Sequence, residues 1–149
     1  MATGDITVFE EAKAYLLDGG WEPADEIWIG LVTNSPAVSA DATIPAYAAG
    51  GTTNFTAIAT AGEYAAGGLL LDTYGNMVAE AAGVMTFNDT GASVSWAKNG
   101  ASPQTAVWGI VYHNTTGLAI AMIELGGPID MQAGDLTITW NASGIFTIE

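Results

Sequence analysis

Hydrophobic residues fall on both faces of the two strands expected between Val107 and Leu125. The segment VWGIVYHNTTGLAIAMIEL predicts a strand pair joined at Asn114–Gly117, because Asn, Thr and Gly favour turns. A half-buried strand alternates apolar and polar side chains, whereas both faces of these strands are largely apolar. Residues 25–34, DEIWIGLVTN, repeat the pattern. We expect these strands in the most buried sheet, with the second face covered by another sheet, a helix or another subunit.

The rest of the C-terminal half predicts further short strands. From residue 67 onward, apolar runs alternate with Gly-containing turns roughly every ten residues, which is typical of an all-β sandwich or barrel. The segment DLTITWNASGIFTIE, residues 135–149, is the clearest expected hairpin, since its apolar and polar residues alternate around a Gly-containing turn. The predicted fold is mainly β, a jelly-roll-like antiparallel β-sandwich with one short N-terminal α-helix.

The N-terminal segment TGDITVFEEAKAYLLDGG predicts that single helix. Thr3 or Asp5 is a suitable cap for its start, and Gly19 and Gly20 suit its end. An amphipathic helix of about three turns is not stable alone, so it must pack on a sheet.

The chain length fits one domain. Residues 34–66 are rich in Ala, Gly, Thr and Ser and predict an irregular loop, which in a compact domain usually makes contacts. The predicted organisation is a single domain over 1–149: helix and connection at 1–20, first strand at 24–33, extended contact loop at 34–66 and remaining sandwich strands at 67–149.

Composition adds an argument for self-association. Hydrophobic residues make up 50% of the chain and charged residues 12%, against about 25% charged in a typical domain. A small monomer has difficulty hiding that much apolar surface, so burial between subunits is the first explanation.

Charge and cysteine content exclude several function classes. The net charge is −14, with two basic residues, Lys13 and Lys98, and no arginine. Binding to nucleic acids or to anionic membranes is therefore not expected. The absence of cysteine excludes disulfides, thiol catalysis and Cys-based zinc sites. The N-terminus does not resemble a signal peptide and no apolar run is long enough for a membrane span, which predicts a soluble product made in a cytoplasm.

The sequence offers few groups for catalysis. His113 is the single histidine, and no motif supplies it with a nucleophile or a carboxylate. We therefore expect it to be a strand-end residue near solvent. The acidic residues match no calcium loop, and no Gly-x-Ser-x-Gly motif is present. The prediction is a protein that is not an enzyme and has no catalytic residue, metal site or cofactor.

The chain's five tryptophans allow two interpretations. Four of them, Trp28, Trp96, Trp108 and Trp140, lie within predicted strands and are expected to be core or interface anchors. Trp21 lies in a connection and is expected to be the most exposed. Aromatic rings on a β-sandwich also stack on sugars, so carbohydrate binding is the competing interpretation.

Several motifs together resemble one family. The segments EYAAGGLLL, VYHNTTGLAIAMIELGG and LTITWNASGIFTI, in this order after an N-terminal helix, are similar to small virion structural proteins of tailed phages, in particular head decoration (cement) proteins. The resemblance implies a homotrimer that binds the major capsid protein on the capsid exterior after synthesis in the host cytoplasm. The alternative is a receptor- or carbohydrate-binding domain of a phage head or tail fibre.

Under this hypothesis, the N-terminal helix and the 34–66 loop are the expected contact regions. The candidate interface residues are apolar or aromatic and lie mostly in these regions or in the strand pair: Val8, Phe9, Leu16, Trp21, Pro45, Tyr47, Phe55, Trp108 and Tyr112.

Overall fold

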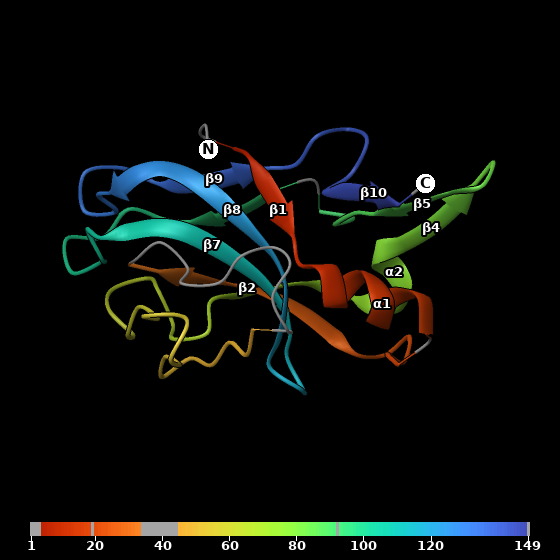
Figure 1. Ribbon diagram of the computed structural model, residues 1–149. Helices are drawn as coiled ribbons and strands as arrows, with labels where there is room; N and C mark the ends of the chain where they lie inside the picture. The colour runs from red at the N-terminus through yellow and green to blue at the C-terminus, as the bar shows by residue number, and fades with distance from the viewer. Residues whose placement is uncertain (1–3, 19, 34–44, 92, 149) are drawn as a thin grey trace.

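The computed structural model of the protein describes residues 4–18, 20–33, 45–91 and 93–148, and not the side chains of residues 16, 17 and 148 (Figure 1). Strands predominate and all pair antiparallel, so the predicted mainly β class is confirmed. The elements in chain order are β1 (Ile6–Val8), α1 (Glu10–Asp18), β2 (Glu26–Val32), β3 (Leu69–Thr73), α2 (Tyr74–Met77), β4 (Val78–Ala81), β5 (Val84–Phe87), β6 (Ser93–Trp96), β7 (Ala106–His113), β8 (Leu118–Ile129), β9 (Leu136–Thr139) and β10 (Phe146–Ile148).

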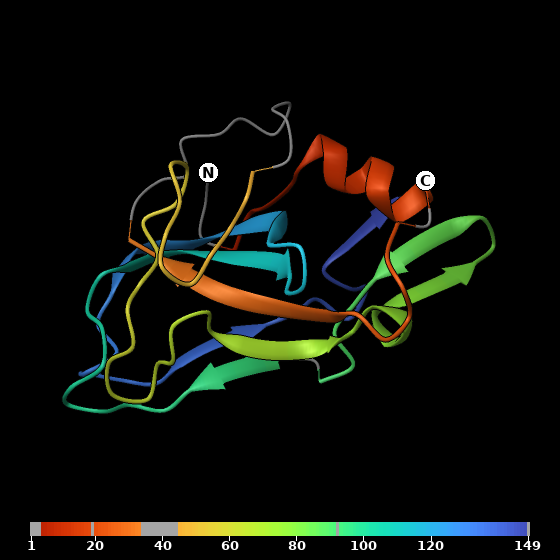
Figure 2. The same ribbon diagram turned by 90° about the horizontal axis from the view of Figure 1, so that it is seen from below.

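The described strands form three sheets. The largest has five strands in the order β1-β8-β7-β2-β3, while β10-β5-β4 and β6-β9 form sheets of three and two strands. A jelly roll divides its strands between two sheets of similar size. The uneven division seen here leaves the jelly-roll part of the prediction unconfirmed. At one end of the molecule, α1 and the β4–β5 hairpin lie close together in both views (Figures 1 and 2).

The pair β7–β8 forms the predicted hairpin in the centre of the large sheet, with β2 on the other side of β7. One face of this sheet packs toward β9. A Cβ atom on Gly109 would lie 3.1 Å from Cδ1 of Ile29 and 3.6 Å from Cδ1 of Ile138. This face is therefore covered by a second layer of the same chain, as the sandwich interpretation expects.

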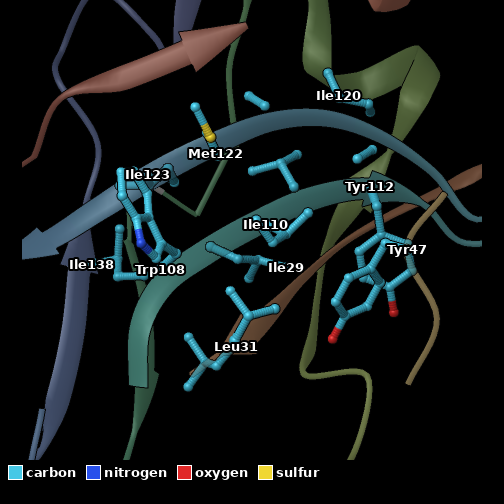
Figure 3. Packing of buried hydrophobic residues seen from close by; sticks show 14 of the residues in the cluster. Ile29, Leu31, Tyr47, Trp108, Ile110, Tyr112, Ile120, Met122, Ile123 and Ile138 are labelled. Carbon is cyan, nitrogen blue, oxygen red and sulfur yellow. The ribbon is translucent and has the colours of Figure 1, made fainter. Parts of the chain in front are cut away.

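The opposite face of the same strands is covered by the segment that follows residue 44. The Tyr47 ring lies 4.4 Å from the Tyr112 ring, centre to centre, and the two rings lie side by side in Figure 3. A Cβ atom on Gly30 would lie only 2.0 Å from the Tyr47 hydroxyl oxygen, so β2 needs glycine there to admit this ring. Both apolar faces of the central strands are therefore covered within the chain.

The loop after residue 44 also continues the sheet at the open end of β2. The backbone N–H of Thr33 donates to the carbonyl of Thr56 at 3.0 Å, and the N–H of Ile58 donates to the carbonyl of Leu31 at 3.0 Å. The Leu31 N–H donates to the Tyr64 hydroxyl at 2.9 Å. The described part of the predicted contact loop thus packs on the chain's own sheet, and its residues 34–44 lie outside the described residues.

The N-terminal segment differs from the prediction of one continuous helix. Residues Ile6–Val8 form β1, which pairs with β8, and α1 begins only at Glu10. Asp5 therefore precedes a strand and does not cap the helix, and Thr3 lies outside the described residues. Phe9 is 0% exposed, between the two elements. The alternation of Ile6, Thr7 and Val8 suits a strand, and an adjacent edge of β8 decides in its favour.

The prediction of a hairpin over residues 135–149 is wrong. Strand β9 pairs with β6 and strand β10 pairs with β5, in different sheets. Between them, only an isolated bridge joins Asn141 and Gly144. A hairpin that sequence did not predict forms instead between β4 and β5, where Ala82 and Gly83 both adopt positive φ angles of 55° and 84°. Two successive positive φ angles suit the turns that join twisted antiparallel strands.

Candidate functional site

His113 occupies the end of β7, where the prediction of a position near solvent is wrong. The residue is 2% exposed. Its ring stacks on Trp21, with the ring centres 5.3 Å apart and the planes 19° apart. The connection after α1 therefore folds back over the end of the sheet and encloses the only histidine of the chain.

Trp21 is also placed differently from the prediction, which expected it to be exposed. It is 4% exposed and meets Tyr74 edge-to-face at 5.5 Å, on the start of α2. Tyr15 of α1 stacks on it at 6.2 Å. Trp21 thus joins α1, α2 and the end of β7, because a large aromatic ring is the most effective apolar surface with which to close such a junction.

Hydrogen bonds define the protonation pattern of the His113 ring. The backbone N–H of Thr116 donates to Nδ1 at 3.1 Å, and the Thr116 hydroxyl lies 2.9 Å from the same nitrogen. A ring nitrogen that accepts an N–H carries no proton, so the proton of the neutral ring belongs on Nε2. Nε2 lies 3.0 Å from Oδ2 of Asp25, although the ring N–H is not well aligned with this oxygen.

Asp25 connects the histidine to two further segments. Its Oδ2 accepts the backbone N–H of Glu22 at 2.7 Å, and its backbone carbonyl accepts the N–H of Tyr74 at 2.7 Å. The contact with the His113 ring is the main cause that lowers the pKa of the Asp25 carboxyl, and the Glu22 N–H lowers it further. We call His113, Thr116, Asp25 and Trp21 the histidine junction.

The histidine junction has the order hydroxyl, imidazole, carboxylate that nucleophilic catalysis uses. Sequence analysis missed it because Asp25 and His113 are far apart in the chain and no motif links them. The Nδ1 acceptor site is, however, already used by a backbone N–H, and the Thr116 hydroxyl oxygen accepts the Leu118 N–H at 3.4 Å. These bonds fix the β7–β8 turn, so the arrangement serves as a structural clamp between segments.

The candidate interface residues are mostly core residues of the chain itself. Phe9, Trp21, Tyr47, Phe55, Trp108 and Tyr112 are all buried, as is Pro45. Val8 is partly buried in β1, and the side chain of Leu16 lies outside the described residues. The structure brings Tyr47, Phe55 and Tyr112 together on one face of the sheet. Seven of the nine candidates are therefore buried within the chain itself.

The described residues contain neither a metal-binding cluster nor a membrane-spanning helix. Among the residues that the structure describes, no three His, Asp or Glu side chains gather as a metal site would require. No described helix has the length and apolar character needed to cross a membrane. Among the large hydrophobic residues whose side chains the structure describes, the exposed ones are Tyr15 and Leu70.

The chain was compared with protein-family models, with curated proteins and with solved structures, and none of the three comparisons finds a match. The resemblance to phage virion proteins therefore remains a prediction from the sequence motifs.

Proposed function

We propose that the chain is a structural protein of a tailed-phage virion, a capsid decoration protein that binds the outer shell and stabilises it by noncovalent contacts. The observation that supports the proposal is a sealed apolar core in a strongly acidic chain. The central strands are covered on both faces by the chain itself, and the net charge is −14 without any arginine. Such a protein stays soluble before assembly and avoids packaged nucleic acid.

The proposed role does not include catalysis. In the histidine junction the imidazole acceptor is committed to a backbone N–H, and the Thr116 hydroxyl belongs to the same turn. The hollows that the structure shows along β1, β8 and β9 and in the loop at residues 50–57 do not include any residue of this junction. Binding and assembly are therefore better supported than turnover.

Self-association as a homotrimer remains part of the proposal, but its argument changes. Composition suggested that apolar strand faces are hidden between subunits. The structure covers these faces within one chain, so the hydrophobic excess no longer requires an oligomer. The trimer follows only from the resemblance to decoration proteins, and the particle mass in solution by light scattering measures it directly.

The competing carbohydrate-binding function loses Trp21, its best candidate for a sugar-stacking residue. Trp21, expected to be an exposed platform, is enclosed between His113 and Tyr74. Trp28 is partly exposed, and its Nε1 donates to Oε2 of Glu26 at 2.9 Å. A sugar platform needs an open aromatic face. Among the described tryptophans, the other rings are buried in the core.

Co-sedimentation tests the proposal. The purified protein is mixed at micromolar concentration with capsids assembled from the major capsid protein encoded in the same genome, without other decoration proteins. We expect saturable binding and a higher disruption temperature of the capsid, because a ligand that binds only the intact shell stabilises it. Capsids already saturated with unlabelled protein are the control. Absence of binding at saturating concentration contradicts the proposal.

A further inference from the structure

The edges of two sheets enclose an apolar groove. In the part of the chain that the structure describes, β1 pairs only with β8, and β9 pairs only with β6. Two hollows of about 290 Å³ and 350 Å³ lie between these edges. Both are lined by Gly4, Ile123, Ile138 and Thr139, so they adjoin each other and form one groove along β9. We call this feature the edge groove.

The floor of the edge groove is apolar. Ile123 and Leu125 of β8 face Leu136 and Ile138 of β9 across it, and all four are buried. Strand β9 contains four residues, which corresponds to roughly 13 Å of extended chain. The length and the lining match a short extended segment better than a helix, because a helix is about 10 Å wide.

The rim of the edge groove is polar and mainly acidic. Glu124 and Asp135 line it. Oδ1 of Asp135 accepts the backbone N–H of Lys98 at 2.7 Å, so one lysine lies at this end. The residues that line the two hollows include two acidic residues and no basic residue, which gives the rim a negative balance.

We propose that the edge groove binds an extended, cationic segment of the shell protein, which adds as a strand beside β9. An exposed sheet edge offers backbone groups that pair with an added strand, and alternate side chains of that strand reach the floor. The floor selects apolar residues, and the acidic rim selects Lys or Arg between them. The inference rests on the proposed function, since it names the site where the chain meets its partner.

A second copy of this chain is a poor occupant of the edge groove. Each copy carries a net charge of −14 and only two basic residues, so two acidic surfaces would meet. Like charges across an interface cost free energy and slow association. The charge balance therefore favours a basic partner over self-association at this place.

The first test uses two capped eight-residue peptides, one of alternating Lys and Val and one of alternating Glu and Val. Amide chemical shifts of the ¹⁵N-labelled protein are followed during titration. We expect the Lys–Val peptide to shift amides of β8 and β9, with weaker binding at higher salt, and the Glu–Val peptide to shift none. Equal binding of both peptides, shifts located elsewhere, or no binding of the Lys–Val peptide overturns the inference.

Isosteric variants provide the matched comparison. Glu124→Gln with Asp135→Asn keeps the side-chain oxygens that accept the N–H groups of Gly126 and Lys98, but removes the charges. We expect this pair to weaken peptide binding roughly 3- to 10-fold. The control is Glu80→Gln, because Glu80 likewise accepts a turn N–H, at 3.1 Å, in the distant β4–β5 hairpin. Equal affinities of the two variants contradict the role of the rim.

Capsids separate this inference from the proposed function. If wild type binds capsids and the Glu124→Gln, Asp135→Asn variant binds them equally well, the groove assignment is wrong and the decoration role stands. If the Lys–Val peptide binds in the groove but wild type does not bind capsids, the decoration role fails and the groove keeps its ligand class. Dimerisation of the protein through the same amides overturns the inference in favour of a second copy.

Discussion

Replacement of Trp21 by alanine provides the strongest test of the histidine junction. The side chain is 4% exposed, stacks on His113 at 5.3 Å and meets Tyr74 at 5.5 Å. Truncation of a buried Phe or Trp to Ala costs about 3–5 kcal/mol. A domain of this size is stable by only about 5–15 kcal/mol. The variant should therefore lose a large part of its free energy of unfolding.

The loss is measured by urea unfolding followed by circular dichroism, together with calorimetry. Since about 1 kcal/mol shifts the melting temperature of a domain of 150–250 residues by 2–4 °C, we expect a decrease of about 6–20 °C. Trp21→Phe is the control. It keeps an aromatic ring on His113, and it removes an indole N–H that has no hydrogen-bond partner among the described residues. We expect it to cost less than half as much as alanine.

A loss below about 1 kcal/mol for Trp21→Ala would refute the enclosed position of this ring, because exposed substitutions usually change stability by less than about 0.5 kcal/mol. The same variant distinguishes a structural role of Trp21 in the histidine junction from a role as a sugar-binding platform. A platform residue would leave stability unchanged and abolish glycan binding. The enclosed ring predicts the opposite result: a less stable protein, and a glycan array on which wild type and variant behave alike.

Three further predictions concern packing and pH. Gly30→Ala places a Cβ atom 2.0 Å from the Tyr47 hydroxyl oxygen, so overpacking should cost about 1–3 kcal/mol in urea unfolding, and an unchanged midpoint would contradict the position of Tyr47. Burial raises the pKa of Tyr112 from 10.0 to about 12. Because the unfolded chain loses this proton at lower pH than the folded protein, the free energy of unfolding should fall as pH rises from about 10 to 12. A constant free energy of unfolding over that interval would contradict the burial of Tyr112. The lowered pKa of Asp25 adds stability that is present above the ordinary pKa of 3.8 and is lost as pH falls below it. Acid should therefore destabilise wild type more than Asp25→Asn. Parallel profiles of unfolding free energy against pH for the two proteins would contradict the contact with His113.

Local sequence patterns were sufficient to predict several of the strands and turns. The hairpin β7–β8 follows from two apolar runs around Asn114–Gly117, and β2 follows from its own apolar run. A turn between two strands depends on neighbouring residues, so the local sequence contains most of the information. The mainly β class follows for the same reason. The strongly acidic charge, the absence of cysteine and the presence of one histidine needed no structure at all.

The pairing of distant strands could not be read from those patterns. Residues 136–148 alternate well enough for a hairpin, yet β9 and β10 pair in different sheets, because free edges on β6 and β5 were available. Residues Ile6–Val8 became a strand because β8 offered an edge. Strand propensity depends on such neighbours more than helix propensity does.

The surroundings of the chemically distinctive residues were decided by tertiary structure alone. From the sequence, His113 is a strand end and Trp21 is a residue in a connection, and both were expected near solvent. Asp25 and Trp21 reach His113 only after β2 has paired with β7, and this brings together side chains that are far apart in the chain. The sequence alone determined which residues are apolar, how short runs of them are arranged and how acidic the chain is. Tertiary packing decided which apolar faces meet and which polar groups become enclosed, because burial is a property of contacts between distant segments and not of any one segment.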